Sequence, residues 1–191
     1  MHVVGQASLA FFYCDFREDQ KKERHGLLTS LLSQLCDQSD AYYAVLSDLY
    51  SANGNGSQHP IDSELQECLL RMLKLPGQAP AYIVIDGLDE CPATSGLLSP
   101  REGALDIVEE LVELQQPNLR ICVTSRPEVD IEPVLRSLAF HSVSLHDESG
   151  QIRDIEEYIK FKVRNDHKTR AWREEDRELV INVLTERADG M

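Results

Sequence analysis

Several features are missing from the 191-residue sequence, and their absence excludes some classes of function. No run of Lys and Arg occurs, and the formal net charge is −14. A nucleic-acid-binding surface is therefore not expected, because phosphate backbones are bound by clustered cations. The most basic stretch, residues 21–24, is interrupted by Glu23 and is typical of a solvated turn or helix start. No apolar stretch approaches the roughly 20 residues of a membrane-spanning helix, so we expect neither nucleic acid nor membrane as a partner.

Closely spaced cysteines are also missing. The five cysteines include no CxxC pair, which argues against a zinc site and against the disulfide framework of a secreted protein. Cys14 and Cys122 fall in apolar patterns and are predicted to be core residues of strands. The apolar stretch 3–13 lacks the basic start and the cleavage site of a signal peptide. A reducing, cytoplasmic compartment is the expected location.

The sequence contains enough apolar residues, 42%, for a globular core. Short apolar stretches predict buried strands, with a weaker candidate at the end, at 7–14, 81–85, 119–124 and 140–145. Amphipathic patterns with helical spacing lie between and after them, at 27–35, 41–49, 65–73, 105–112, 129–138, 152–163 and 179–184. Asp62 or Ser63 is a candidate cap for the third helix. This alternation predicts an α/β fold with a parallel sheet covered by helices on both faces.

The character of the sequence changes near residue 150, where strand patterns end and two helical patterns flank a charged stretch. We therefore expect residues 1–148 to form the α/β core. Residues 149–191 are predicted to begin a helical or winged-helix region.

Residues 82–90 form the most informative segment. Four apolar or aromatic residues are followed by three carboxylates, Asp86, Asp89 and Glu90. Open α/β sheets bind ligands at the carboxyl ends of their strands, and massed carboxylates repel one another unless a cation lies among them. Oxygen ligands of this kind suit Mg²⁺, so the segment is typical of a Walker B element. A solvated acidic turn and another magnesium-dependent phosphotransfer fold are alternative interpretations.

A second polar segment, residues 124–127, follows the predicted strand 119–124. Its Arg126 stands directly after a buried strand. One interpretation is that Arg126 terminates the strand and pairs with a carboxylate.

Four stretches together resemble the NACHT family of signal-transduction NTPases, of the STAND class. They are residues 11–17, 27–36, 82–90 and 120–127. The resemblance is strongest to fungal proteins in which such a domain precedes ankyrin or other repeats, and to the nephrocystin-3-like N-terminal domain. It implies an incomplete P-loop NTPase fold, a three-layer α/β/α structure with a parallel sheet, followed by a short helical segment.

The resemblance also implies roles for individual residues. Asp86 would hold Mg²⁺ through a water molecule, and Asp89 and Glu90 would form an acidic pair, one of which polarises the attacking water. Arg126 would sense the γ-phosphate of ATP or GTP. In this family the nucleotide state controls oligomerisation, so self-association or repeat-domain partners are implied for the full-length protein.

One hallmark of that family is missing. The sequence has no Gly-Lys-Ser or Gly-Lys-Thr, so it lacks the Walker A loop whose backbone N–H groups and Lys bind the phosphates. The family places that loop upstream of the strand 7–14, and its strand beside the strand 119–124. We therefore expect a fragment of a nucleotide-dependent switch, inactive alone, with a gap or an uncovered sheet edge. The alternative is a non-catalytic interaction or vestigial module.

Overall fold

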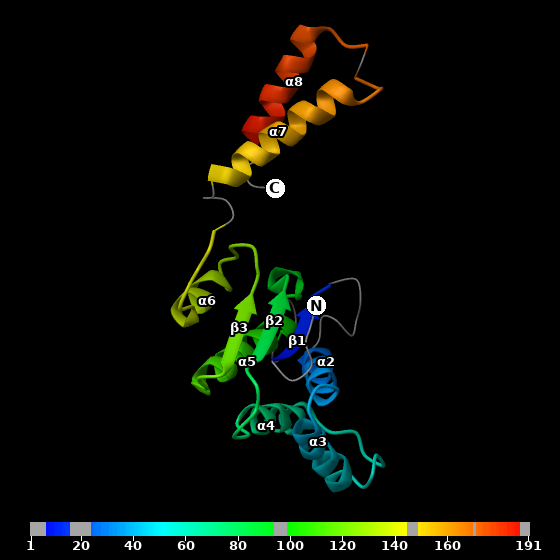
Figure 1. Cartoon of the computed structure of the whole chain (residues 1–191), viewed down its shortest axis with the longest axis vertical. Coiled ribbons are helices and arrows are strands. Elements are labelled where there is room, and N and C mark those ends of the chain that lie inside the picture. The colour runs from blue at the N-terminus through cyan, green and yellow to red at the C-terminus, as the bar shows by residue number, and fades with distance from the viewer. Residues whose placement is uncertain (1–6, 16–23, 94–98, 145–148, 170, 188–191) are drawn as a thin grey trace. The chain divides into compact units, whose positions relative to one another are not determined.

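A computed structural model describes residues 7–15, 24–93, 99–144, 149–169 and 171–187 (Figure 1). The chain divides into two compact units, Met1–Ala139 and Phe140–Met191. The first unit consists, in chain order, of β1 (Ser8–Tyr13), α2 (Arg24–Cys36), α3 (Asp40–Ala52), α4 (Asp62–Leu73), β2 (Ala81–Asp86), the short 3₁₀ helix η1 (Leu88–Glu90), α5 (Pro100–Glu113), β3 (Leu119–Val123) and α6 (Glu132–Leu138). These elements confirm the strands predicted at 7–14, 81–85 and 119–124 and the helices predicted between them.

The sheet has three parallel strands in the order β1-β2-β3. Ile85 of the central strand aligns with Phe12 on one side and with Val123 on the other. Since parallel strands run in one direction, all three carboxyl ends lie at the same edge of the sheet. The predicted parallel sheet is confirmed, and its register decides which side chains can form a site.

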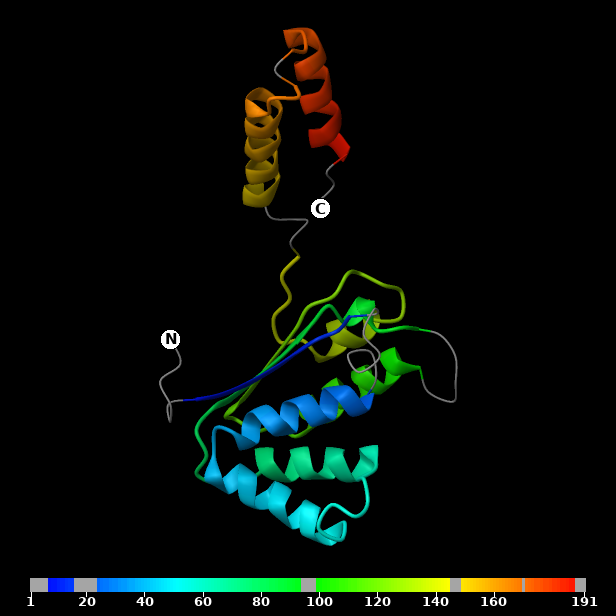
Figure 2. The same ribbon diagram turned by 90° about the vertical axis from the view of Figure 1, so that its right-hand side faces the viewer.

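Among the described elements of the first unit, helices cover one face of this sheet. Alternate strand residues are buried on the helical side, among them Ala10, Ile83 and Ile85, each fully shielded from solvent. Figure 2 shows the sheet nearly edge-on, with α2 (blue), α4 (teal) and α5 (green) on the same side. The opposite face carries exposed side chains from all three strands: Leu9, Phe11, Tyr13, Tyr82 and Cys122.

The prediction that helices cover both faces, and with it the three-layer arrangement, is wrong for the described residues of the first unit. The strand order explains why. Connections between parallel strands are right-handed, so two successive crossovers that advance in the same direction, β1 to β2 to β3, place their helices on the same face. Covering the other face requires a reversal of strand order. Cys122, predicted as a core residue, points to the uncovered face and is exposed.

The outer edge of β1 is closed by Gln34 of α2 and by Gln38, which lies in the turn after this helix. The Gln38 side chain accepts a hydrogen bond from the Leu9 N–H at 2.9 Å and donates one to the Leu9 carbonyl oxygen at 2.7 Å. Gln34 does the same for Phe11, at 3.1 and 2.8 Å. The two amides thus replace the backbone of a further strand, and they satisfy polar groups that an edge strand leaves open.

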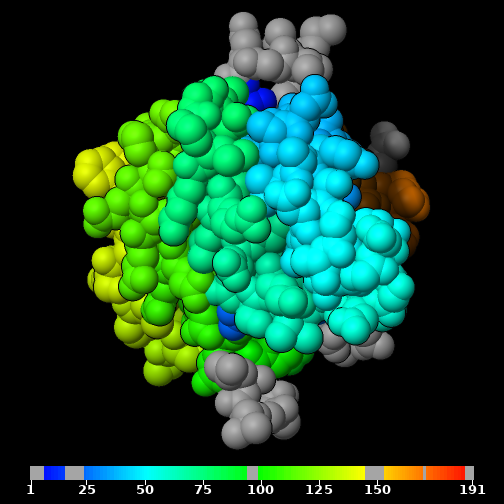
Figure 3. Space-filling view, turned by 90° about the horizontal axis from the view of Figure 1, so that it is seen from below, coloured from blue at the N-terminus to red at the C-terminus, as the bar shows by residue number. Residues whose placement is uncertain are grey.

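The helical layer is held by leucines. Leu28 and Leu31 of α2 and Leu69 of α4 have no exposed surface, and α3 and α4 lie side by side (Figure 3). The predicted cap of α4 is wrong, because the N-cap residue is Ile61. The Ile61 N–H donates to the Glu64 carboxylate at 3.0 Å, which satisfies the helix start without a capping hydroxyl or carboxylate at the N-cap position.

The strand predicted at 140–145 is not formed. Residues 140–144 have no strand pairing, Phe140 is 91% exposed, and Leu145 lies outside the described residues. The apolar pattern of this segment is typical of a strand. A strand, however, is stabilised by pairing with a neighbouring strand, and residues 140–144 have no such partner.

The second unit contains α7 (Ser149–Asn165) and α8 (Glu174–Arg187). The two helices contact each other, with Val163 and Ile181 buried and an ion pair of 2.7 Å between Arg164 and Glu178. None of the helices in the described parts of the chain combines the length and the apolar character that a membrane span requires.

Because one sheet face is covered and the other is exposed, equivalent substitutions by alanine on the two faces should lower the free energy of unfolding by different amounts. Ile83→Ala should lower the free energy of unfolding by about 2–5 kcal/mol, because it leaves a cavity in the core. Leu9→Ala removes the same number of carbon atoms from a side chain that is 38% exposed on the uncovered face, and should cost at most about 1.5 kcal/mol. Urea denaturation of the two variants measures both values, and equal losses would contradict the one-sided core.

The glutamine contacts predict a residue-specific loss of hydrogen-exchange protection. Gln34→Ala should speed exchange of the Phe11 amide by about tenfold, which corresponds to a hydrogen bond of about 1.4 kcal/mol, and leave Leu9 unaffected. Gln38→Ala should have the converse effect. NMR-detected exchange on the two variants is the measurement, and each variant is the control for the other.

Candidate functional site

The acidic turn begins where β2 ends. Asp86 is the last residue of the strand, and Gly87 turns the chain with a φ of 70°. A side chain disfavours this left-handed conformation, so glycine suits the position. Leu88 then anchors η1 with a fully buried side chain, while Glu90 is exposed. The turn therefore holds its carboxylates at the carboxyl edge of the sheet.

Thr124 joins this turn to the end of β3. Its hydroxyl donates a hydrogen bond to the Asp86 carboxylate and accepts one from the Gly87 N–H at 3.0 Å. The Thr124 carbonyl accepts the Leu88 N–H, also at 3.0 Å. One residue thus fixes the carboxylate and the backbone of the turn together.

Arg126 lies against the second carboxylate of the turn. Its backbone N–H donates to Asp89 at 3.1 Å, and its side-chain Nε lies 3.5 Å from the other carboxylate oxygen. The Asp89 side chain is 12% exposed, whereas that of Arg126 is 83% exposed. The guanidinium is therefore accessible from solvent while it partly neutralises Asp89. This geometry agrees with the interpretation that Arg126 pairs with a carboxylate.

Arg101 supports the turn from α5. Its Nη2 donates to the Asp89 carbonyl at 2.7 Å and its Nε to the Cys91 carbonyl at 2.9 Å. Its Nη1 lies 3.1 Å from both carboxylate oxygens of Asp130. The side chain is only 11% exposed, so this arginine spans the segment that carries Asp89 and Glu90 and restricts its motion.

Two buried cysteines flank the turn. Cys14 follows β1 and Cys91 follows η1. A side-chain hydrogen bond with Cys91 raises the pKa of Cys14, and burial adds to the effect. The hydrogen bond from Cys14, together with the positive charge of Arg101, lowers the pKa of Cys91 in spite of its burial.

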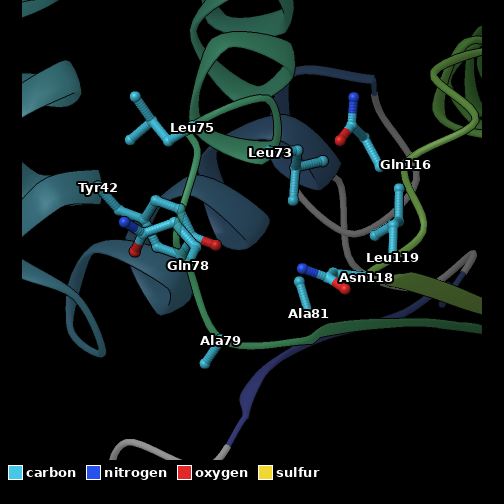
Figure 4. Close-up of a pocket in the computed structure, with 9 residues that line it drawn as sticks. All are labelled: Tyr42, Leu73, Leu75, Gln78, Ala79, Ala81, Gln116, Asn118 and Leu119. Carbon is cyan, nitrogen blue, oxygen red and sulfur yellow. The ribbon is translucent and has the colours of Figure 1, made fainter.

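The small cavity of this unit lies at the opposite end of the sheet. It measures about 30 Å³ and is lined from the amino ends of β2 and β3 and the end of α4 (Figure 4) by Tyr42, Leu73, Leu75, Gln78, Ala79, Ala81, Gln116, Asn118 and Leu119. A volume of this order accommodates a water molecule and no nucleotide. The cavity therefore does not compete with the acidic turn as a ligand site.

The structure brings Asp86, Asp89 and Arg126 together and leaves Glu90 exposed beside them. Neither Thr124 nor Arg101 was among the predicted site residues. Arg101 lies in the first turn of α5, where the helix dipole disfavours a cation, but the predicted helical pattern began only at residue 105. For Thr124 the only signal is its place after a strand.

Comparison with known proteins identifies one family. A family model described as Nephrocystin 3, N-terminal, matches residues 3–126. The matched range covers more than half of the chain and contains the acidic turn and Arg126. No curated protein and no solved structure matches the chain.

The hydrogen bonds of Thr124 predict a difference between two nearly isosteric substitutions. Thr124→Val leaves the Gly87 N–H and the Asp86 carboxylate without their partner and should cost about 1–3 kcal/mol in unfolding free energy. Thr124→Ser keeps the hydroxyl and should cost less than half as much. Chemical denaturation at neutral pH measures both, and equal costs would show that the hydroxyl does not hold the turn.

Proposed function

The chain belongs to the nephrocystin 3 N-terminal family, and from this we propose that it forms the magnesium and sensor side of a NACHT-type nucleotide-binding switch with a P-loop NTPase fold. The observation that carries the proposal is the hydrogen-bonded junction of two strand ends, in which Thr124 bonds to Asp86 and Arg126 pairs with Asp89. An acidic strand end beside a polar strand end with a solvent-accessible arginine suits a ligand that carries both a cation and a phosphate.

The donor atoms at the junction fit Mg²⁺. Among the described residues no group of three or more His, Cys, Asp and Glu side chains could hold a metal ion. Mg²⁺ does not need such a cage, since it usually takes one or two carboxylates together with waters and substrate phosphates. Asp86, oriented by Thr124, is the residue proposed to hold the ion through a water molecule. The ion would supply charge stabilisation for a phosphoryl group.

The other site residues are proposed to act on the attacking water and on the charge of the phosphate. Glu90 is exposed beside Asp89, and one of these two carboxylates is proposed to polarise the attacking water. Arg126 is proposed to move from Asp89 toward the γ-phosphate of ATP or GTP, which its exposed guanidinium allows. The proposed setting is the cytoplasm, where nucleotide binding would control self-association or contacts with repeat domains of the full-length protein.

The phosphate cradle has to come from outside these 191 residues, because no Gly-Lys-Ser or Gly-Lys-Thr occurs in them. Two features of the sheet leave room for it. The face with Leu9, Phe11 and Tyr82 is uncovered, and β3 is an edge strand. We propose that a strand adds beside β3 and that its following helix covers the exposed face, so that the loop between them faces the acidic turn.

A second candidate is a protein-interaction module without catalysis. The carboxylates of Asp86 and Asp89 have hydrogen-bond partners within the chain, in Thr124 and Arg126, which favours a turn with a structural role. The exposed aromatic side chains of the uncovered face would then contact a protein partner.

Nucleotide binding separates these candidates. By calorimetry, the 191-residue chain should bind Mg²⁺ with ATP or GTP no more tightly than about 1 mM, because the cradle is missing. If the gene encodes an in-frame G-x-x-x-x-G-K-[ST] upstream, the extended chain should bind at least about 100-fold more tightly, a gain of about 2.7 kcal/mol. Tight binding by the short chain would contradict the missing cradle, and no binding by the extended chain would favour the interaction module.

Variants of the extended chain test the individual roles. Asp86→Ala should weaken magnesium-dependent binding, and Glu90→Ala should slow hydrolysis by about 100-fold or more with little change in binding. Glu113→Ala, which removes an exposed carboxylate at the end of α5, is the matched control and should change neither. Equal hydrolysis rates in all four proteins would refute the assigned roles.

A further inference from the structure

We propose that two copies of the chain associate through the outward face of α8, with the two helices antiparallel about a twofold axis. This face consists of six residues with the spacing i, i+3, i+4, i+7, i+8 and i+11, which places them on one side of a helix. They are Asp176, Leu179, Val180, Val183, Leu184 and Arg187, and we call them the outer stripe. The proposal does not rest on the proposed nucleotide-binding function, because α8 lies outside the residues 3–126 that the family model matches.

The opposite face of α8 is occupied by α7. Ile181 is 2% exposed, and Glu178 forms an ion pair of 2.7 Å with Arg164 of α7. The outer stripe faces away from this contact, so that Leu179 is 63% and Leu184 is 46% exposed. Single exposed apolar residues are normal, but four on one continuous face of a helix are typical of a contact surface.

The outer stripe is self-complementary, because its spacing is the same from either end and its two ends carry opposite charges. In an antiparallel pair that crosses at the middle of the stripe, Asp176 lies opposite Arg187 of the second copy, and the apolar residues of both copies meet between them. A twofold axis repeats each contact, so the dimer contains two such ion pairs. A parallel pair would place like charges together. The helix dipole favours these charges at the two ends, but it does not require them to share a face with four apolar residues.

A hollow at the amino end of the outer stripe fits the arginine of a second copy. It measures about 290 Å³ and is lined by Trp172, Asp176, Leu179 and Val180. In such a site a guanidinium can lie over the indole ring and pair with the carboxylate. Arg187 of the second copy is the side chain that the antiparallel arrangement brings there. In the described part of the second unit, neither Asp176 nor Arg187 has an ion pair with another side chain, so both are available.

The length of the stripe sets the expected affinity. Residues 176–187 correspond to about 18 Å of helix, and such a contact is smaller than the roughly 800 Å² per partner of a standard interface. A weak dimer is therefore expected, with a Kd on the order of 100 µM. The net charge of −14 on each copy opposes association. At about 0.15 M salt this repulsion is screened beyond roughly 8 Å, whereas side chains in contact are screened much less.

Sedimentation velocity of the 191-residue chain at about 0.15 M salt tests the proposal. Between about 10 µM and about 1 mM, the mass should rise from 21.6 kDa toward twice that value. Val183→Lys places a charge in the apolar centre of the stripe and should weaken association at least about tenfold. Val129→Lys makes the same change of charge at a residue of the first unit that is 92% exposed, and should leave association unchanged. Circular dichroism should show the same helix content in both variants.

Two outcomes of this experiment would overturn the proposal. A chain that stays monomeric over the whole range would show that the stripe is not an interface between copies and serves another partner. Equal association of the Val183→Lys and Val129→Lys variants would show that the copies meet through a different surface, such as the uncovered sheet face.

Exchange of charges tests the antiparallel pairing. Asp176→Arg alone and Arg187→Asp alone each place like charges opposite one another, and each should weaken association by about tenfold. An equimolar mixture of the two variants should associate as tightly as the unsubstituted chain, because each supplies the charge that the other lacks. Recovery in the mixture also shows that both variants are folded. A chain with both substitutions should behave in the same way. If the mixture and the doubly substituted chain remain as weak as the single variants, the pairing of Asp176 with Arg187 is wrong.

Discussion

The structure depends on one constraint, which is the parallel, in-register pairing of β2 with a strand on each side. This pairing sets Asp86 at the same sheet edge as Cys14 and Thr124, the residues that directly follow β1 and β3. It also decides the shape of the unit, since a strand order that advances in one direction keeps both crossovers on one face. The helical layer, the uncovered aromatic face and the location of the acidic turn all follow from it.

The two edges of this sheet are finished differently. At β1, Gln34 and Gln38 occupy the polar groups of Leu9 and Phe11. At β3, the Thr124 N–H points to β2. Because backbone groups alternate in direction along a strand, those of Ile121 and Val123 point outward. Among the described residues, side chains close the β1 edge and no element pairs with the β3 edge, which is consistent with a sheet that accepts a further strand at β3, as the proposed function requires.

The spacing of apolar residues was sufficient to predict the three strands of the sheet and the helices, because a buried strand and an amphipathic helix each require a particular spacing within their own segment. It failed where the outcome depends on neighbours distant in the sequence. The apolar segment 140–144 has no strand to pair with, and Cys122 is exposed because no helix covers its face. The structure brings the predicted site residues together, but the residues that hold them in place by hydrogen bonds were not predicted. Thr124 and Arg101 act through hydrogen bonds that only the register and the packing of α5 create.

The most direct test of this account is amide hydrogen exchange along β3 in the 191-residue chain, measured by NMR. The account predicts alternation: the Cys122 and Thr124 amides, which face β2, exchange slowly, and the Ile121 and Val123 amides, at the open edge, exchange at least about tenfold faster, a difference of about 1.4 kcal/mol. Uniform protection of all four amides would contradict it, because the outer edge of β3 would then already be occupied.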